Sequence, residues 1–268
     1  MIPTDTAAKF DTTSPQEFVE YYARQSLSDS TRARFEAICS KVLKLLTNAQ
    51  RTEPWQVLDI GCGPGMQCIT WAAKGHRACG LDINEALIDI AQRRGNDAGL
   101  MIDFKVGSAT ALPYDNESMD VCLMPELLEH VQDWEICVRE AVRVLRRQGV
   151  LFLSTTNFLC PVQYEFNLPL YSWYPAILKR HCEQLATTTR PALANYARYP
   201  AVHWFSFYRL RRYLARYDLE CHDRFQMLDP NSGSTARQFI TGLLRQSAFF
   251  RFVGQICSTG TVVFAVKR

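Results

Sequence analysis

Three glycines at alternate positions, Gly61, Gly63 and Gly65, follow an apolar run that ends at Asp59–Ile60. Glycine adopts backbone conformations that other residues avoid, and it leaves no side chain between the backbone and a ligand. A strand that enters a glycine-rich turn and then a helix presents free backbone N–H groups, which is how open α/β sheets bind nucleotides. The spacing predicts a nucleotide-type site, although Met66 stands where the dinucleotide fingerprint requires its third glycine.

Two further groups of residues follow the glycines, each at the end of another apolar run. Asp82 ends the second run, where a carboxylate can accept hydrogen bonds from both hydroxyls of a ribose. Gly107, Ser108 and Ala109 close the third run. Because the carboxyl ends of parallel strands meet at one edge of a sheet, these residues predict a bound adenosine in the crevice there.

Alternating strand-like and helix-like segments position these residues. The strands are expected at 56–60, 77–83, 102–106, 119–124 and 149–155, and the helices between them at 67–73, 85–94 and 134–146. Amphipathic helices at 14–25 and 31–46 precede them, and a helix at 206–216, a strand at 219–227, a helix at 235–249 and a strand at 261–266 follow. Repeated βα units predict a parallel, doubly wound sheet.

The alternation stops between Phe158 and Pro200, where five prolines stand among aromatic residues. The segment is too apolar for disorder and too interrupted for one long helix, so we expect a lid or cap; the alternative is a separate small apolar core. We divide the chain into an N-terminal helical segment (1–50), a binding core (51–157), a lid or substrate insertion (158–205) and a C-terminal segment that completes the sheet (206–268).

Composition limits the classes of function. The 268 residues suit one large α/β domain with an insertion, and a net charge of +3 gives no reason to expect nucleic acid as a partner. The ten cysteines form no C-x-x-C pair, so we expect buried, reduced thiols and a cytoplasmic location. No segment is long and apolar enough to span a membrane; peripheral membrane contact through arginines beside aromatic residues is a minority interpretation.

Longer motifs carry a family resemblance. The segments VLDIGCGPG, GLDI, GSATALPYDNESMDVC, ELLEHVQDW and VLRRQGVLFLSTTN, in that order within 57–157, resemble class I S-adenosylmethionine-dependent methyltransferases. Glu126-x-x-Glu129-His130 and the run 154–157 are similar to the ubiquinone-biosynthesis O-methyltransferase branch. The resemblance implies a Rossmann-like, doubly wound α/β sheet of seven strands, parallel except for one strand near the C-terminus, with a helical and aromatic insertion after strand five.

The resemblance also implies that S-adenosylmethionine is the cofactor and leaves as S-adenosylhomocysteine. The implied cofactor-binding residues are Arg32, Asp59, Gly61, Cys62, Gly63, Gly65, Asp82, Ile83, Ser108, Ala109 and Pro125. Asp82 would hold the ribose and Ile83 would pack on the adenine, whereas Ser108 stands where many members have aspartate. Structural alternatives remain: Asp82 as a helix cap, Ser108 as a turn residue and Arg32 as a solvated charge.

Methyl transfer from a sulfonium is an in-line displacement, and a phenolic acceptor must also lose a proton. His130 and Glu129 are the candidate catalytic residues; His130 as a structural residue is the alternative. We expect no bound metal, although Glu126, Glu129 and His130 leave a divalent cation as an alternative. The predicted acceptor is a small molecule methylated on a phenolic, quinone-like or other hydroxyl oxygen.

Other functions stay open at this point. The acceptor atom could be nitrogen or carbon instead of oxygen. A non-catalytic partner protein with the methyltransferase fold and a nucleotide-dependent oxidoreductase are the alternatives from other classes. The sequence identifies neither the acceptor nor the oligomeric state.

Overall fold

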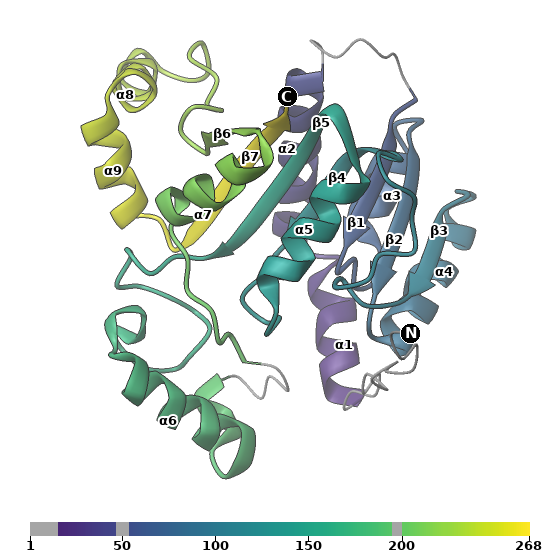
Figure 1. Ribbon diagram of the computed structural model, residues 1–268, viewed down its shortest axis with the longest axis horizontal. Coiled ribbons are helices and arrows are strands. Elements are labelled where there is room, and N and C mark those ends of the chain that lie inside the picture. Colours follow the sequence, from purple (N-terminus) through teal and green to yellow (C-terminus); the bar gives the residue numbers. More distant parts are fainter. Residues whose placement is uncertain (1–15, 47–53, 195–199) are drawn as a thin grey trace, which may run out of the picture.

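A seven-stranded sheet forms the centre of the computed structural model, which describes residues 16–46, 54–194 and 200–268 (Figure 1). The strands are β1 (Gln56–Ile60), β2 (Arg77–Asp82), β3 (Asp103–Val106), β4 (Met119–Pro125), β5 (Leu145–Thr156), β6 (Leu219–Asp223) and β7 (Gly260–Lys267). Their order is β3-β2-β1-β4-β5-β7-β6, and β7 runs antiparallel to β5 and β6. The predicted doubly wound sheet with one reversed strand is confirmed. Its strand order reverses between β1 and β4, where such sheets bind ligands.

Helices connect and cover the strands. They are α1 (Gln16–Gln25), α2 (Asp29–Leu46), α3 (Met66–Ala72), α4 (Glu85–Asp97), α5 (Trp134–Val144), α6 (Ala176–Thr188), α7 (Phe207–Leu214), α8 (Thr235–Gln246) and α9 (Ala248–Ile256). Short 3-10 turns, η1 (Tyr171–Trp173), η2 (Pro191–Ala194) and η3 (Ala215–Tyr217), lie between them. Several expected boundaries were wrong. The strand expected at 219–227 ends at Asp223, and the strand expected at 149–155 begins at Leu145. Leu145 is already extended and ends α5, and Ser247 divides the expected helix at 235–249 because its hydroxyl caps α9.

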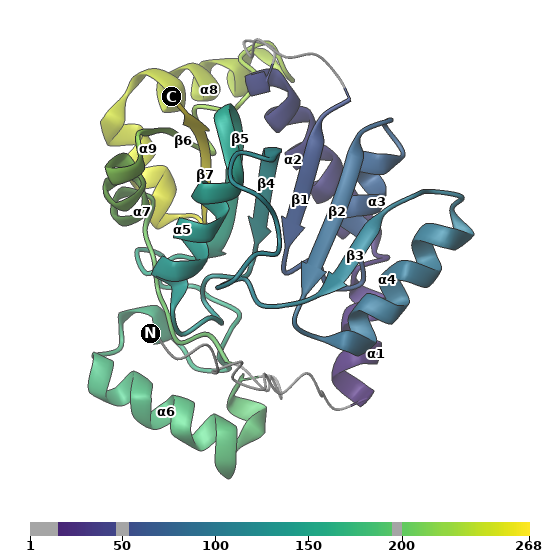
Figure 2. The same cartoon turned by 45° about the vertical axis from the view of Figure 1, so that its right-hand side comes forward.

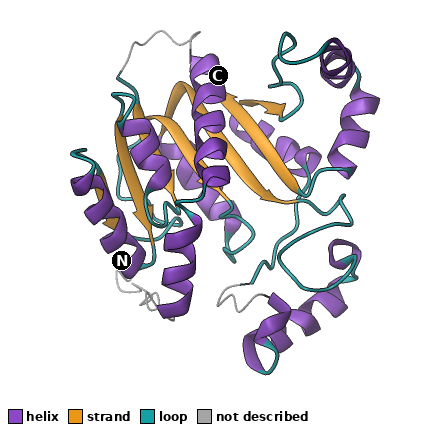
Figure 3. Cartoon of the chain, turned by 180° about the vertical axis from the view of Figure 1, so that it is seen from behind, coloured by secondary structure: helices purple, strands orange, loops and turns teal. Residues whose placement is uncertain are grey.

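Apolar side chains fill both faces of the sheet. Leu58 and Ile60 of β1 pack in the cluster beneath α5 and α7, whereas their neighbour Val57 packs in the cluster beneath α2, α3 and α4. Successive side chains of a strand point to opposite faces, so a strand covered on both sides contains almost no polar residue. Figure 3 shows the resulting three layers from behind, with helices in front of the strands and behind them.

The segment between β5 and α7 forms a small apolar cluster of its own around α6. It contains Phe166, Tyr171, Ala186, Ala194 and Trp204. Figure 2 shows α6 and α1 on the side of the sheet toward which the carboxyl ends of β1, β2 and β4 point. The expected site therefore lies on the side of the molecule that carries both of these helices.

The cysteines follow the expectation from composition in most positions. All ten are free thiols, and seven are buried: Cys39, Cys62, Cys68, Cys79, Cys122, Cys137 and Cys160. The expectation is wrong for Cys182 and Cys221, which are half-buried, and for Cys257, which is exposed. None of the helices within the described ranges is both long enough and apolar enough to cross a membrane.

Candidate active site

The loop after β1 is fixed by backbone hydrogen bonds to β2. The N–H groups of Gly61 and Cys62 both donate to the carbonyl of Leu81, over 2.7 and 3.1 Å. Asp82 continues the connection, because its Oδ2 accepts the N–H of Gly63 over 2.8 Å and its Oδ1 accepts the N–H of Asn84 over 2.8 Å. One carboxylate thus holds both the glycine loop and the turn that leads into α4.

The three glycines adopt left-handed conformations, with φ of +78° at Gly61, +50° at Gly63 and +79° at Gly65. A Cβ on Gly65 would lie 2.7 Å from Ala91 Cβ and 2.8 Å from Phe104 Cζ, so this glycine permits α3 to pack closely on its neighbours. A Cβ on Gly63 would meet nothing within 4 Å. Gly63 therefore borders open space, which is where a ligand on this loop would lie.

The structure excludes one interpretation of Asp82, that of a helix cap, and its contact with a ribose stays a prediction. The cap of α4 is Asn84, whose side chain accepts the N–H of Leu87. Asp82 is therefore not the helix cap. Burial raises the pKa of Asp82, and hydrogen bonds from the backbone of Asn84, Gly63 and Ile83 oppose this shift. Each carboxylate oxygen has two lone-pair directions, so the backbone contacts leave acceptor capacity for a ribose.

Asp59 lies behind the glycine loop. Its side chain is buried, and its Oδ2 accepts a weak hydrogen bond from the Cys68 thiol over 3.8 Å. Its Oδ1 has no hydrogen-bond partner among the described residues. Burial, with a smaller contribution from Asp82, raises the pKa of Asp59 to about 7. Burial also raises the pKa of the Cys62 thiol to about 11, so that group is neutral. These two residues support the loop from the protein interior.

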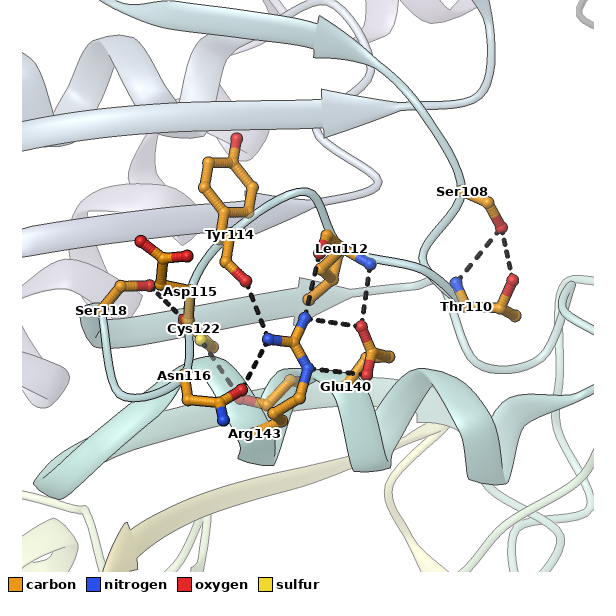
Figure 4. Close-up of polar contacts among 11 residues, drawn as sticks. Ser108, Thr110, Leu112, Tyr114, Asp115, Asn116, Ser118, Cys122, Glu140 and Arg143 are labelled. Carbon is orange, nitrogen blue, oxygen red and sulfur yellow. Dashed lines mark hydrogen bonds and ion pairs between the residues drawn. The ribbon is translucent and has the colours of Figure 1, made fainter. Parts of the chain in front are cut away.

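Ser108 takes part in a local turn after β3 (Figure 4). Its hydroxyl lies 2.7 Å from the hydroxyl of Thr110 and accepts the N–H of Thr110 over 3.2 Å. Ala109 packs on the apolar cluster beneath α5. The turn-residue interpretation of Ser108 thus has direct support, and contact with an adenine at this position stays a prediction.

Hydrogen bonds from Arg143 of α5 hold the rest of the loop that follows β3. Its guanidinium pairs with Glu140 through two hydrogen bonds of 2.8 Å, and it donates to the carbonyls of Leu112 and Tyr114 over 3.0 and 2.8 Å (Figure 4). A further bond of 2.9 Å reaches Asn116 Oδ1. A planar guanidinium with several fixed donors is suited to such cross-linking. The loop between β3 and β4 is therefore held by α5.

The residues after β4 pair with those at the end of β5. Pro125, the last residue of β4, is aligned with Ser154. The hydroxyl of Ser154 donates to Glu126 Oε1 over 2.5 Å, and the hydroxyl of Thr155 donates to Glu129 Oε2 over 2.8 Å. Hydrogen bonds between side chains thus join the Glu126-x-x-Glu129-His130 motif, which follows β4, to the run 154–157 at the end of β5.

Glu129 is fully buried. Burial, and then the nearby Glu126, raises its pKa well above the usual value, and its Oε1 has no protein partner. Its carbonyl accepts the N–H groups of Val202 and His203, over 2.9 and 3.3 Å. Because the side chain is enclosed, it does not reach a substrate directly. Glu129 would therefore affect a reaction only by positioning or polarising a neighbouring group.

His130 lies in the turn between β4 and α5, where its backbone N–H donates to the carbonyl of Leu127 over 3.0 Å. Its side chain is half-buried at the carboxyl edge of the sheet. The expected position is therefore reproduced, and its role as a base stays a prediction. Within the described residues, no three His, Cys, Asp or Glu side chains gather closely enough to hold a metal ion.

Arg94 connects α1 to the glycine loop. Its Nη1 donates to Ser26 Oγ over 2.8 Å and to the carbonyl of Pro64 over 3.3 Å, and its Nη2 donates to the carbonyl of Ala23 over 2.8 Å. Burial, and then the charge of Arg32, lowers the pKa of Arg94. Arg32 itself is exposed on α2. Sequence reasoning singled out Arg32 and missed Arg94, because the partners of Arg94 lie up to 71 positions away and no local pattern marks it.

A cavity of about 540 Å³ opens beside the paired ends of β4 and β5. It is bordered by α2, by β5 and β7, and by residues 163–165 of the inserted segment. Burial, and then Glu126, raises the pKa of Glu165 to about 7. The cavity thus has carboxylates at the end that adjoins β4, the strand next to the glycine loop.

Three comparisons with known proteins agree with this geometry. Residues 58–153 match the family described as a methyltransferase domain. The ubiquinone biosynthesis O-methyltransferase of Bartonella quintana is 33% identical over 122 residues, which cover 46% of this chain and 49% of the relative. The enzyme of the same name from Sinorhizobium medicae is 35% identical over 108 residues, 40% of this chain and 44% of the relative. The chain spans about half the length of the curated relatives it matches.

Solved structures share the fold. The plantazolicin methyltransferase BpumL, crystallised with S-adenosylhomocysteine, is 13% identical with a TM-score of 0.57, covering 94% of this chain and 89% of that one. The PH0226 protein of Pyrococcus horikoshii OT3 is 15% identical with a TM-score of 0.55, covering 95% and 100%. The domain match, the curated relatives and the fold lead to one conclusion: residues 58–153 match a methyltransferase domain, within a sheet that has the class I methyltransferase fold.

Proposed function

We propose that this chain uses S-adenosylmethionine to methylate a hydroxyl oxygen, phenolic or quinone-like, of a small molecule. The observation that carries the proposal is the conformation of the glycine loop that Asp82 holds. The backbone at Gly63 is left-handed, and the space into which a Cβ of Gly63 would project is open. A loop of this shape accepts a ligand against its backbone, and the carboxylate beside it is suited to a ribose.

The residues present fit the donor. The glycine loop would receive its methionine and ribose portions, Asp82 would accept hydrogen bonds from the ribose hydroxyls, and Ile83 would pack on the adenine. Ser108 and Ala109 would meet the adenine edge, in a loop that Arg143 holds in place. The donor supplies an electrophilic methyl group when bound.

The acceptor side lies at the ends of β4 and β5. Holding two reactants in line can lower a barrier by about 7–11 kcal/mol in the best intramolecular models, so positioning is the main task of the protein. His130, at the carboxyl edge of the sheet, would take the hydroxyl proton, and Glu129 would hold the surrounding backbone through Val202 and His203. Oxygen is favoured as the acceptor atom because the curated relatives are named O-methyltransferases.

The proposal is tested with donor that carries a labelled methyl group. Phenols, quinone precursors, sugars and amines are offered in parallel, and the label is expected in an O-methyl product. Asp82→Asn serves as the control with an impaired donor site and should show much slower transfer. Label that appears only in amines would contradict the choice of oxygen, and no transfer to any acceptor despite donor binding would favour the non-catalytic alternative.

A further inference from the structure

Three cationic side chains line the cavity. Arg34 of α2 lies near Glu126, whereas Lys41 of α2 and Arg224, which follows β6 directly, lie beside β5 and β7. The ammonium group of Lys41 lies 6.0 Å from the ring centre of Phe264. Arg224 Nη2 donates to the carbonyl of Gly260 over 2.5 Å, while its Nε is buried without a protein partner. Within the described ranges, no carboxylate lies within ion-pair distance of either side chain.

The positive charges of Lys41 and Arg224 repel one another. Burial lowers the pKa of Lys41, and the charge of Arg224 lowers it further. Burial lowers the pKa of Arg224 as well, and the more distant charges of Glu126 and Asp223 oppose this shift only in part. Taking a cation out of water is costly unless an anion compensates it, and two cations that share one cavity increase that cost.

Nearby acidic groups have other partners. Asp223 precedes Arg224 in sequence, but its Oδ1 accepts the N–H groups of Phe225 and Gln226, and its Oδ2 lies 3.6 Å from Arg251 Nε. At the other end of the cavity, Glu126 accepts the hydroxyl of Ser154, and its Oε1 lies 4.0 Å from Arg34 Nη1. The cavity therefore contains a cationic end that the described chain does not neutralise.

Apolar side chains lie between the two ends. The rings of Phe152 and Phe264 are 5.0 Å apart between centres, and Ile38 and Val262 complete this part of the lining. The cavity thus has a cationic end, an apolar middle and an end that contains Glu126 and Ser154. A ligand that matches it has an anionic group and an apolar body, with a neutral polar group at the far end.

We propose that Lys41 and Arg224 bind an oxyanion on the methyl acceptor, a carboxylate or a phosphate ester. The apolar body of the acceptor then lies on Phe152 and Phe264, and its hydroxyl lies at the end of the cavity that contains Glu126 and Ser154. Glu126 stands four residues before His130, the proposed base, in the turn after β4. This inference rests on the proposed function, because it assigns to the acceptor a cavity that begins at Glu126, directly after Pro125 of the expected donor site. It adds a chemical class to an acceptor that the methyltransferase fold leaves undefined.

The test is titration calorimetry without any donor, so its result does not depend on methyl transfer. The probes are phenylacetate, phenyl phosphate and the neutral phenylacetamide. Both anions are expected to bind more tightly than the amide, and Lys41→Gln and Arg224→Gln are expected to weaken the anions at least tenfold while leaving the amide unchanged. The tighter of the two anions identifies the oxyanion as carboxylate or phosphate.

Matched variants keep the test decisive. Arg212→Gln on α7 changes an exposed residue outside the cavity lining and should leave binding of the anions unchanged. Arg224→Lys retains the charge and should recover part of the lost affinity, which separates loss of charge from misfolding. Equal binding of the anions and the amide, no binding of either anion, or an equal loss in the Arg212→Gln control would overturn the proposal. A failure of S-adenosylmethionine to bind would instead contradict the proposed function alone.

Discussion

The backbone N–H of Gly63 donates a hydrogen bond of 2.8 Å to Asp82 Oδ2. This contact joins the loop after β1 to the end of β2, and the second oxygen of the same carboxylate accepts the N–H of Asn84 over 2.8 Å. Asp82 therefore orders the loop before any ligand arrives. A loop that is already in its binding conformation loses little conformational entropy when it binds.

Asp82→Asn should weaken the binding of S-adenosylmethionine at least tenfold. The amide keeps the size of the side chain, but it removes the charge and replaces one acceptor oxygen with a donor, so either the loop or the ribose loses a partner. Titration calorimetry measures the change. Asp89→Asn, an exposed acid on α4, is the matched control. Unchanged affinity in Asp82→Asn would remove Asp82 from the donor site.

Gly63→Ala should weaken the donor while leaving the fold nearly intact. A Cβ at Gly63 meets no protein atom within 4 Å, so it would project into the space assigned to the ligand. Gly75→Ala is the matched control, since Gly75 also has a positive φ, +88°, and open space around its Cβ position. Both variants should lose about 1 kcal/mol of stability from the left-handed backbone, measured by urea unfolding. Equal donor affinity in the two variants would show that the ligand lies elsewhere.

Arg94→Gln should release α1 from the glycine loop. The variant loses the guanidinium that reaches Ala23, Ser26 and Pro64 at once. Limited proteolysis should then cleave within α1 faster than in the unmodified protein, and donor affinity should fall. Arg93→Gln, an exposed neighbour on the same helix, should change neither. Unchanged cleavage in Arg94→Gln would mean that other contacts hold α1.

Asp59 should make folding stability depend on pH. Its pKa is about 7 in the folded chain, above the 3.8 of a free carboxyl, so the folded state holds the proton more tightly than the unfolded state does. This proton linkage favours folding fully below about pH 4, and the contribution is lost as the pH rises toward 7. Asp59→Asn removes the linkage, so its stability relative to the unmodified protein should rise over the same interval.

Urea unfolding at several pH values between about 4 and 8 measures this effect. The exposed Asp89→Asn should show no comparable trend. A difference between Asp59→Asn and the unmodified protein that stays constant with pH would contradict the assignment of the raised pKa to Asp59.

The sheet could be predicted from sequence because its strands are short apolar runs separated by clear turns. The expected strand at 56–60 coincides with β1, since Val57 and Leu58 are buried on opposite faces and Gly61 ends the run. The C-terminal boundaries were harder. Ser247 ends one helix and caps the next, so a continuous apolar pattern at 235–249 conceals a break.

The candidate site was predictable only where local sequence determines it. The glycines and Asp82 sit beside one another in consecutive βα units, so their meeting follows from the topology. Arg94 was not predictable, because its partners lie on α1 and in the glycine loop. Lys41 and Arg224 lie 183 positions apart in the sequence. They line one cavity because α2 packs on β5, and β7 pairs with both β5 and β6.

Binding of S-adenosylmethionine to the folded protein tests the central claim most directly. Titration calorimetry should show that the donor and S-adenosylhomocysteine each bind once per chain and compete for the same site. Folded protein that binds neither ligand would contradict the account.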